Sequence, residues 1–305
     1  DVHVAVCIVA YRNPGDVGKC LAALEQQSHT DFAVIICENG GDVASRALAA
    51  ILPAQLAGGQ PVRLITAPDN PGYAGGVNRC LAASPDADAW WVLNPDTEPQ
   101  PGALRALIDR LARGDVAAVG GLILAGDGRI GSCGGHWTPW LAFSSTIGKG
   151  LPVDAAPSEA EVEGKLSFVS GASLLCSRRF VETAGPMRED YFLYGEEVEW
   201  CLRARRAGLR LGYAPGASVV HHQGTATGSD RAVAERARLP VYFDERNRML
   251  TLRDTMPLLL PVGALGALAT LLYRYGRRRA WTQLGIALSA WRDGLLNRRG
   301  KPDWV

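Results

Sequence analysis

Short apolar runs alternate with helical patterns along the first part of the chain. Three runs, at residues 4–10, 32–37 and 90–93, are continuous enough to be buried strands, and residues 62–65 predict a further strand between them. After each run, apolar residues recur at helical spacing, as at Val17, Cys20, Leu21 and Leu24. This alternation of strand, loop and helix predicts an α/β fold with a mostly parallel, Rossmann-like, doubly wound sheet flanked by helices.

The pattern is weaker beyond residue 100. It predicts a helix around Leu104, Leu107 and Leu111 and then a strand at 117–120. Residues 126–165 contain many Gly and Pro with scattered aromatic residues, which predicts irregular strands and loops covering a cleft. Regular structure is expected again at 166–175, and the remaining predicted elements are a helix at 197–207 and strands at 211–214 and 217–220.

The C-terminal part has a different character. Residues 257–273 are almost wholly apolar, and these 17 residues are at the lower limit for a helix that spans a membrane. Basic and aromatic side chains follow: Arg274, Arg277, Arg278, Arg279, Trp281 and Trp291. Such a cluster suits the cytoplasmic face of an anionic membrane, so we expect peripheral membrane contact. The alternative is a helical hairpin packed on the rest of the chain or on a second copy in a homodimer.

Charge and cysteine usage narrow the function classes. The chain has 32 Lys and Arg against 31 Asp and Glu, so its net charge of +1 gives no general attraction to nucleic acid. None of the seven cysteines forms a Cys-x-x-Cys pair, and several lie in apolar runs. We therefore expect reduced, buried thiols in a cytoplasmic protein rather than zinc ligands or disulfides. No signal peptide is expected, because the sequence begins with a strand.

A lone carboxylate follows the fourth predicted strand, in the segment Asn94-Pro95-Asp96. Open α/β sheets bind ligands at the carboxyl ends of their strands, and hard divalent cations combine one or two carboxylates with substrate phosphates. The sequence therefore predicts a Mg²⁺ or Mn²⁺ site at Asp96, although the same segment also favours a plain turn. His221 and His222 end a later strand, where they would either complete that site or form a surface pair.

A second acidic cluster, Glu196, Glu197 and Glu199, stands at the start of a predicted helix. Acidic residues there can simply favour the helix dipole. The aromatic approach from Tyr191 to Tyr194 indicates instead a partly desolvated pocket, where crowded carboxylates raise one another's pKa. A raised pKa suits a general base near neutral pH, and at most one of Glu196 and Glu197 can face the reacting group.

The segment 70–78 contains Gly72, Gly75 and Gly76 directly before a predicted helix. Glycines at a helix N-terminus resemble a phosphate-cradling turn. Neither the Gly-x-Gly-x-x-Gly fingerprint after the first strand nor a P-loop is present, so a nucleotide would be held through a metal.

Together these segments resemble the family-two inverting glycosyltransferases with the GT-A fold, close to the rhamnosyltransferase and galactofuranosyltransferase branch. The resemblance covers residues 2–250 in the family's order and is carried by 6–11, 38–40, 70–78, 93–96, 169–172, 192–200 and 220–222. It implies a catalytic domain over 1–250, with a nucleotide-sugar half at 1–120 and an acceptor half at 121–250. Residues 251–305 would form a C-terminal apolar and basic helical segment.

The resemblance also implies roles for single residues. Asp96 would hold the Mg²⁺ or Mn²⁺ that bridges the donor diphosphate, with His221 as the later metal ligand and His222 as the less favoured choice. Asn94 is neutral where the family's Asp-x-Asp motif has a carboxylate, so it would hold a ribose or a water. Glu197 would be the catalytic base, with Glu196 as the fallback. The other implied donor-binding residues are Ala10, Tyr11, Glu38, Asn39, Asn70, Gly75, Gly76, Asn78, Pro95 and Arg246, and the implied acceptor-binding residues are Tyr194, Trp200 and Arg203.

The implied reaction is inverting transfer of a rhamnose-like or other hexose from a dTDP-, UDP- or GDP-linked donor to a glycan or lipid-linked glycan. It would take place on the inner face of the cytoplasmic membrane, in cell-envelope polysaccharide biosynthesis. A sugar nucleotidyltransferase is one alternative, but it would carry a Gly-rich loop with Arg and Lys after the first strand, where only Arg12 stands. A non-catalytic, membrane-associated sugar-nucleotide-binding protein is the other, and the joint presence of Asp96, Glu197 and His221 argues against it.

Overall fold

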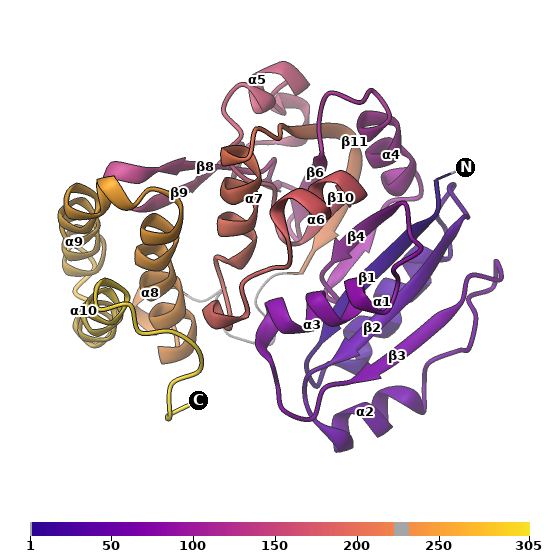
Figure 1. The fold of residues 1–305 in the computed structure, drawn as a ribbon, viewed down its shortest axis with the longest axis horizontal. Helices are drawn as coiled ribbons and strands as arrows, with labels where there is room; N and C mark the ends of the chain where they lie inside the picture. The colour runs from indigo at the N-terminus through magenta and orange to yellow at the C-terminus, as the bar shows by residue number, and fades with distance from the viewer. Residues whose placement is uncertain (1, 223–231) are drawn as a thin grey trace.

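The computed structural model describes residues 2–222 and 232–305. Within them a central sheet has the strand order β3-β2-β1-β4-β10-β6-β11-β5, and β7 pairs with β6. Figure 1 labels the strands of this sheet except β5 and β7. The strands are β1 (Val4–Ala10), β2 (Phe32–Glu38), β3 (Val62–Thr66), β4 (Ala89–Leu93), β5 (Thr97–Pro99), β6 (Ala118–Ala125), β7 (Ile130–Ser132), β10 (Ser173–Ser177) and β11 (Leu211–His221).

The sheet is mostly parallel, as predicted. Strands β1–β4, β6 and β11 run one way, whereas β5, β7 and β10 run against them. The predicted parallel winding therefore ends at β4, where the antiparallel strand β10 is inserted between β4 and β6. The sequence pattern did not reveal this reversal, because a strand buried on both faces is apolar throughout whichever way it runs.

Helices cover both faces of the sheet. The helices α1 (Pro14–Leu24), α2 (Asp42–Ala49) and α4 (Ala103–Leu111) share one core with alternate β1 residues such as Val6 and Ile8. The helices α3 (Gly72–Ala82), α6 (Arg178–Ala184) and α7 (Glu196–Arg206) share the other core with Cys7 and Val9. The period-two alternation of β1 thus supplies both cores, which confirms the doubly wound arrangement.

Residues 126–165 are irregular, as predicted, and contain short elements that no periodicity in the sequence indicates. They include the separate hairpin β8 (Gly135–Thr138) and β9 (Phe143–Thr146) and the short helix α5 (Glu159–Glu163). Regular structure at 166–175 was predicted too early, since the strand begins only at Ser173. The Ser158 and Glu161 side chains form a capping box at the start of α5, a signal that could have been read from the sequence.

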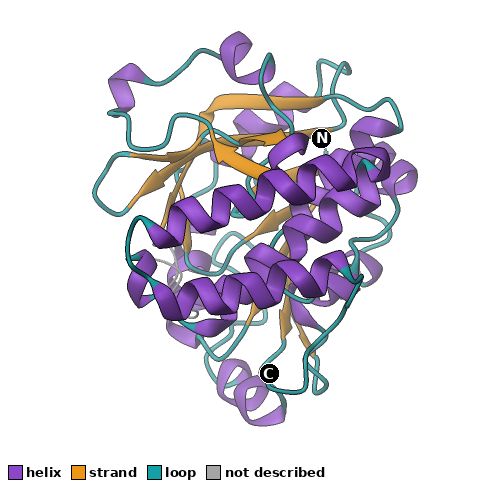
Figure 2. Ribbon diagram, turned by 90° about the vertical axis from the view of Figure 1, so that its left-hand side faces the viewer, coloured by secondary structure: helices purple, strands orange, loops and turns teal. Residues whose placement is uncertain are grey.

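Three helices form the C-terminal part: α8 (Arg238–Thr255), α9 (Leu260–Gly276) and α10 (Trp281–Leu295). They pack together beside the sheet and lie in front of it in Figure 2. The expected boundary at residue 250 falls inside α8. By length and composition, one helical stretch of the described chain, Pro257–Gly276, could cross a membrane, although 28% of its apolar window is buried.

All seven cysteines are buried free thiols, as expected.

Candidate functional site

The turn after β4 is fixed by two hydrogen bonds and by a buried proline. The Asn94 N–H donates to the Ala172 carbonyl (3.1 Å), and the Thr97 hydroxyl donates to the Asn94 carbonyl (2.6 Å). Pro95 is buried within the turn. The Asp96 side chain therefore stands in a defined position at the carboxyl end of β4.

Strand pairing brings Asp96 to one of the two histidines. β5 pairs antiparallel with β11, with Thr97 opposite His221, and the His221 Nε2 lies 3.1 Å from the Asp96 Oδ1. Both side chains are largely buried, at 13% and 15% exposed. His222 points elsewhere: its ring contacts the Glu98 carboxylate at 2.9 Å, and both groups are solvent-exposed. Successive strand residues face opposite sides, so only His221 joins Asp96.

Asp96 and His221 are a chemically suitable pair for a hard to borderline divalent cation. No cluster of three or more His, Cys, Asp or Glu that could hold a metal occurs among residues 2–222 and 232–305. Mg²⁺ and Mn²⁺ commonly combine one or two such protein ligands with phosphate oxygens and water. The donor set fits a metal that binds together with its substrate.

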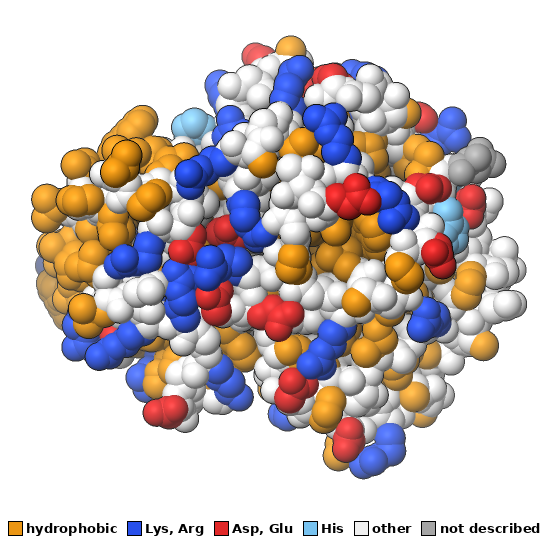
Figure 3. All heavy atoms as spheres, in the orientation of Figure 1, with side chains coloured by type: hydrophobic (Ala, Val, Ile, Leu, Met, Phe, Trp, Pro, Cys, Tyr) orange, Lys and Arg blue, Asp and Glu red, His pale blue; other side chains and the backbone are white. Residues whose placement is uncertain are grey.

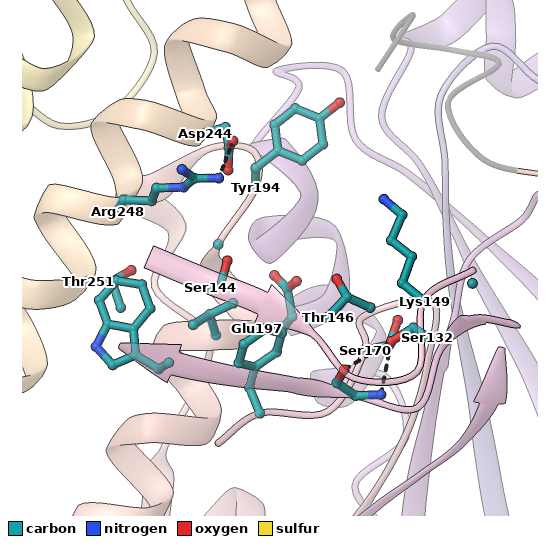
Figure 4. A pocket seen from close by; sticks show the side chains of 16 residues that line it. Ser132, Ser144, Thr146, Lys149, Ser170, Tyr194, Glu197, Asp244, Arg248 and Thr251 are labelled. Atoms are coloured by element: carbon teal, nitrogen blue, oxygen red, sulfur yellow. Dashed lines mark hydrogen bonds and ion pairs between the residues drawn. The ribbon is translucent and has the colours of Figure 1, made fainter. Parts of the chain in front are cut away.

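Glu197 lines a cavity of about 240 Å³ between α7, α8 and the β8–β9 hairpin (Figure 4). The helix α7 starts abruptly because Tyr194 and Gly195 both have positive φ, of 67° and 80°. Glu197 and Lys149 point into the same open space, while Asp244 and Arg248 of α8 pair with each other on another side (2.8 Å). The remaining polar lining comes from Ser132, Ser144, Thr146, Ser170, Tyr194 and Thr251.

The two adjacent glutamates are in different environments. Glu196 is only 2% exposed, and its Oε2 has no hydrogen-bond partner in the described structure. Burial, and then the charge of Glu197, raise the pKa of Glu196 to about 8, so it carries a proton at neutral pH. Burial also raises the pKa of Glu197, but backbone N–H groups at the start of α7 oppose that shift. Of the two, only Glu197 lines the cavity.

Tyr73 connects the turn that holds Asp96 with the backbone beside Glu197. Its hydroxyl donates to the Asn94 Oδ1 (3.0 Å) and to the Gly171 carbonyl (3.2 Å). Gly171 in turn lies against Glu197, since a Cβ at Gly171 would sit 3.3 Å from the Glu197 Cγ. Burial raises the pKa of Tyr73, and the charges of Glu196, Glu197 and Asp96 raise it further.

Tyr73, Trp137, Lys149, Asp244 and Arg248 were not predicted as site residues. Tyr73 lies within the segment 70–78, where the glycines drew attention instead. The others reach the cavity from the irregular region and from α8, and no local motif indicates that they meet.

Residues after β1 and β2 form the neighbouring part of the same sheet edge. Glu38 is buried, and its Oε1 accepts the backbone N–H groups of Arg12 (3.1 Å) and Gly40 (2.6 Å). Its Oε2 has no partner within the described residues. Tyr11, next to Ala10 at the end of β1, is 43% exposed. Tyr11 is thus open to a ligand at this edge, whereas Glu38 holds the loops after β1 and β2 together.

The segment 70–78 serves packing rather than a phosphate. The Tyr73 N–H donates to the Phe192 carbonyl (2.9 Å), so the start of α3 is already capped. A Cβ at Gly75 would sit 2.5 Å from Pro71, and one at Gly76 would sit 2.6 Å from Val9. The predicted cradle is corrected accordingly: these glycines let α3 approach β1 and its own preceding turn.

The asparagines of this segment, and Asn39 after β2, also make structural contacts. The Asn70 side chain accepts the Gly72 N–H (3.3 Å), and the Asn39 side chain donates to the Gly72 carbonyl (2.8 Å). Asn78 bonds both backbone groups of Met187 at 2.9 Å. Asn39, Asn70 and Asn78 therefore hold loops together. In Asn78 both side-chain polar groups already bond to Met187, which leaves neither free for the expected donor-binding role.

Two of the expected acceptor residues lie outside the cavity. Trp200 is fully buried, packs edge-on against Phe180 with ring centroids 4.8 Å apart, and donates to the Gly185 carbonyl (2.8 Å). Arg203 pairs with Glu199 (2.9 Å) and binds nearby carbonyls. Both hold α7 to the segment that precedes it, so of the three expected residues only Tyr194 lines the cavity.

Arg246 is likewise a structural residue. It is 1% exposed and donates to the carbonyls of Tyr191 (2.9 Å) and Gly300 (2.6 Å) and to the Asn247 side chain (3.0 Å). It thus ties the C-terminal segment and α8 to the approach of α7.

Arg246→Ala is expected to lower the free energy of unfolding by about 3 kcal/mol, because the change removes a buried guanidinium together with its hydrogen bonds to Tyr191, Gly300 and Asn247. Urea denaturation followed by circular dichroism measures this. Arg105→Ala is the matched control, since Arg105 forms an exposed pair with Asp109 and such pairs contribute about 0.5 kcal/mol or less. Equal losses in the two variants would contradict the role given to Arg246.

The sequence of this chain is similar to those of known proteins. Residues 5–180 match the family model described as glycosyl transferase family 2. The chain is 29% identical over 251 residues to N-acetylglucosaminyl-diphospho-decaprenol L-rhamnosyltransferase of Mycobacterium tuberculosis, covering 74% of this chain and 78% of the relative. It is also 29% identical over 192 residues to the low-salt glycan biosynthesis hexosyltransferase Agl10 of Haloferax volcanii, covering 62% and 59%.

Solved structures agree on the fold. The mannosyltransferase PcManGT from Pyrobaculum calidifontis, in complex with GDP-Man and Mn²⁺, superposes with a TM-score of 0.59 at 15% identity, over 98% of this chain and 88% of that one. GalNAc-T7 with UDP, GalNAc and Mn²⁺ gives 0.59 at 14% identity, over 81% and 51%. These neighbours have the GT-A fold, which confirms the expected architecture.

Proposed function

The chain belongs to glycosyl transferase family 2, and from this premise we propose that it transfers a hexose, rhamnose or a similar sugar, from a nucleoside-diphosphate donor to a glycan or lipid-linked acceptor, with inversion. One observation carries the proposal: the Tyr73 hydroxyl bonds both to Asn94, in the turn that holds the Asp96–His221 pair, and to the carbonyl of Gly171, which lies against Glu197. A leaving diphosphate and an attacking hydroxyl need groups of these two kinds close together.

In the proposed mechanism the Glu197 carboxylate accepts the proton of the acceptor hydroxyl as its oxygen attacks the anomeric carbon. The bond from that carbon to the diphosphate oxygen breaks on the opposite face, so the configuration inverts. Glu196 stays protonated beside the base, which leaves a single negative charge to orient the hydroxyl. When bound, a divalent cation held by Asp96 and His221 would neutralise charge on the leaving diphosphate.

We assign the acceptor to the cavity beside Glu197. Trp137 presents an apolar wall there, and its buried Nε1–H has no partner within the described residues, so it can donate to a sugar oxygen. The Lys149 amine is exposed at the same cavity. A cation there suits an acceptor that carries phosphate, as the acceptor named for the mycobacterial relative does.

We place the donor at the edge formed by Tyr11, Glu38 and the Asp96 turn, so that residues 1–120 hold the nucleotide and residues 121–250 most of the acceptor. The activity would lie on the cytoplasmic side, in peripheral contact with the membrane through residues 251–305.

A thermal-shift screen of UDP-, dTDP- and GDP-sugars with Mn²⁺ or Mg²⁺ identifies the donor, and acceptor-dependent release of nucleoside diphosphate tests the reaction. Release of pyrophosphate from a nucleoside triphosphate and a sugar phosphate would instead indicate a nucleotidyltransferase. Donor binding with no turnover against any glycan or lipid-linked acceptor would indicate a binding protein.

His221→Ala is expected to weaken Mn²⁺-supported binding of the donor about 10- to 100-fold, the usual effect of removing a side chain that supports a metal. His222→Ala is the matched control, and it should leave binding nearly unchanged because that ring contacts Glu98 at the surface. Titration calorimetry of the nucleoside diphosphate with and without Mn²⁺ measures both. A larger loss in the His222 variant would reverse the assignment.

A further inference from the structure

The helix α9 is apolar on both of its sides, but only one side is covered. Gly263, Ala264, Ala267, Leu271 and Tyr275 are buried against neighbouring elements. The opposite side exposes large apolar residues, with Leu258 just before the helix 94% exposed and Leu265 69% exposed. We call this side the α9 outer face, and its members are Leu258, Val262, Leu265, Leu272 and Tyr273. In Figure 3 it forms part of the hydrophobic area over α9.

The outer face extends to the tip of the β8–β9 hairpin. Trp140, in the 3-10 turn Pro139–Leu141 between these strands, is 57% exposed. Gly266 of α9 lies directly against the backbone of Trp140, where a Cβ would collide with its carbonyl oxygen. A helix that is apolar all round is normally buried, and contiguous exposed apolar surface marks an interaction site.

The charged side chains of residues 255–292, the stretch that contains this face, are all positive. Arg277, Arg278 and Arg279 are exposed at the end of α9, and Trp281, which follows them, is 65% exposed. The sequence contains no Asp or Glu from residue 255 to residue 292. Apolar residues, aromatic residues and unopposed arginines together match an anionic lipid surface rather than a protein core.

The inner side of α9 fixes how the helix would meet such a surface. The Trp291 indole donates to the Ala264 carbonyl (3.0 Å), and Arg274 forms an ion pair with the buried Glu245. A spanning orientation would break these contacts and take the ion pair into hydrocarbon. The helix is therefore suited to lie in the plane of the interface, with its outer face toward the acyl chains.

The same core joins the outer face to the acceptor cavity. Trp137 lines the cavity and packs in one cluster with Ala264 and Ala267 of α9, and the chain reaches the exposed Trp140 only three residues later. We propose that the α9 outer face and Trp140 bind an anionic bilayer in plane, so that the cavity beside Glu197 opens next to the membrane for a lipid-linked acceptor. The second half of this statement rests on the proposed function, whereas membrane binding can be measured without donor or acceptor.

The test is flotation of the full chain with vesicles of phosphatidylcholine and phosphatidylglycerol. The unaltered protein is expected to float with these vesicles and to bind pure phosphatidylcholine less. Leu265→Glu combined with Leu272→Glu should lower the partition coefficient about a hundredfold, because each leucine contributes roughly a tenfold effect when buried. Val43→Glu is the matched control: Val43 is an apolar residue of α2, 74% exposed and far from α9, and its change should have no effect.

A second variant tests the charges separately. Changing Arg277, Arg278 and Arg279 to Gln should remove the preference for phosphatidylglycerol while leaving the melting temperature unchanged. Equal flotation of the leucine variant and the unaltered protein would overturn the proposal. A second outcome would also overturn it: the unaltered protein is a dimer in light scattering, the leucine variant is a monomer, and neither binds vesicles. The face would then be a subunit contact. Nucleotide-induced thermal shifts of the same samples report the proposed function separately.

Discussion

Replacing Glu197 by Gln is expected to lower the turnover of sugar transfer by about 10²- to 10⁴-fold, the usual contribution of a general base. The amide keeps the shape of the side chain in the cavity but cannot take the acceptor's proton. Donor binding should persist, because Glu197 lies on the acceptor side of Tyr73. Acceptor-dependent release of nucleoside diphosphate measures turnover, and calorimetry measures donor affinity. Unchanged turnover would remove Glu197 as the base.

The matched control is Glu196→Gln, the same change one residue earlier. A neutral amide there replaces a carboxyl group that is already neutral at pH 7, so its cost to turnover should be far smaller. In the unfolded chain Glu196 ionises at its ordinary pKa, so its raised pKa makes the native state lose stability as pH rises from 4.5 toward 8. The Glu196→Gln variant should lack that loss, and thermal melts at pH 5 and pH 8 would show it.

The pH dependence of turnover is a further test of Glu197 as the general base. Glu197 acts only when ionised, and burial raises its pKa above the ordinary 4.5. The rate should therefore fall on the acid side at a pH above that value. A rate that stays constant down to pH 4.5 would contradict a buried base.

Asp96→Ala is expected to weaken metal-supported donor binding about 100-fold, because the cation would lose its only carboxylate near the diphosphate. Glu98→Gln is the matched control, since Glu98 lies two residues further on, loses the same charge and contacts only the exposed His222 among the described interactions. Donor titration in the presence of Mn²⁺ compares the two. Full activity in excess chelator would exclude a metal role for Asp96.

The fold was predicted best where a hydrophobic pattern is compatible with only one kind of element. The apolar runs at β1, β2 and β4 predict buried strands, and these strands pair in parallel, as does the partly exposed β3. The antiparallel direction of β10 left no local trace, and β5 is too short for a pattern. Direction and edge pairing depend on contacts far apart in the chain, which a local reading does not contain.

The candidate site shows the same division. Asp96 and His221 follow apolar runs, and chains that leave a sheet at the same edge meet there, so their meeting could be anticipated. Gly76 and Arg246 could not be assigned correctly, because a glycine that admits Val9 and a glycine that admits a phosphate are identical in sequence. An arginine that binds carbonyls likewise has the same letter as one that binds phosphate.

The continuity of α8 has a practical consequence for studying this enzyme. One face of the helix supplies Asp244 and Arg248 to the cavity wall, while Met249 and Leu252 pack with Ala264 and Ala267 of α9. A shortened version ending near residue 250 would strip the apolar support from the wall that holds the acceptor. Solubility engineering and crystallisation trials should therefore keep the chain whole and exchange individual outward-facing leucines.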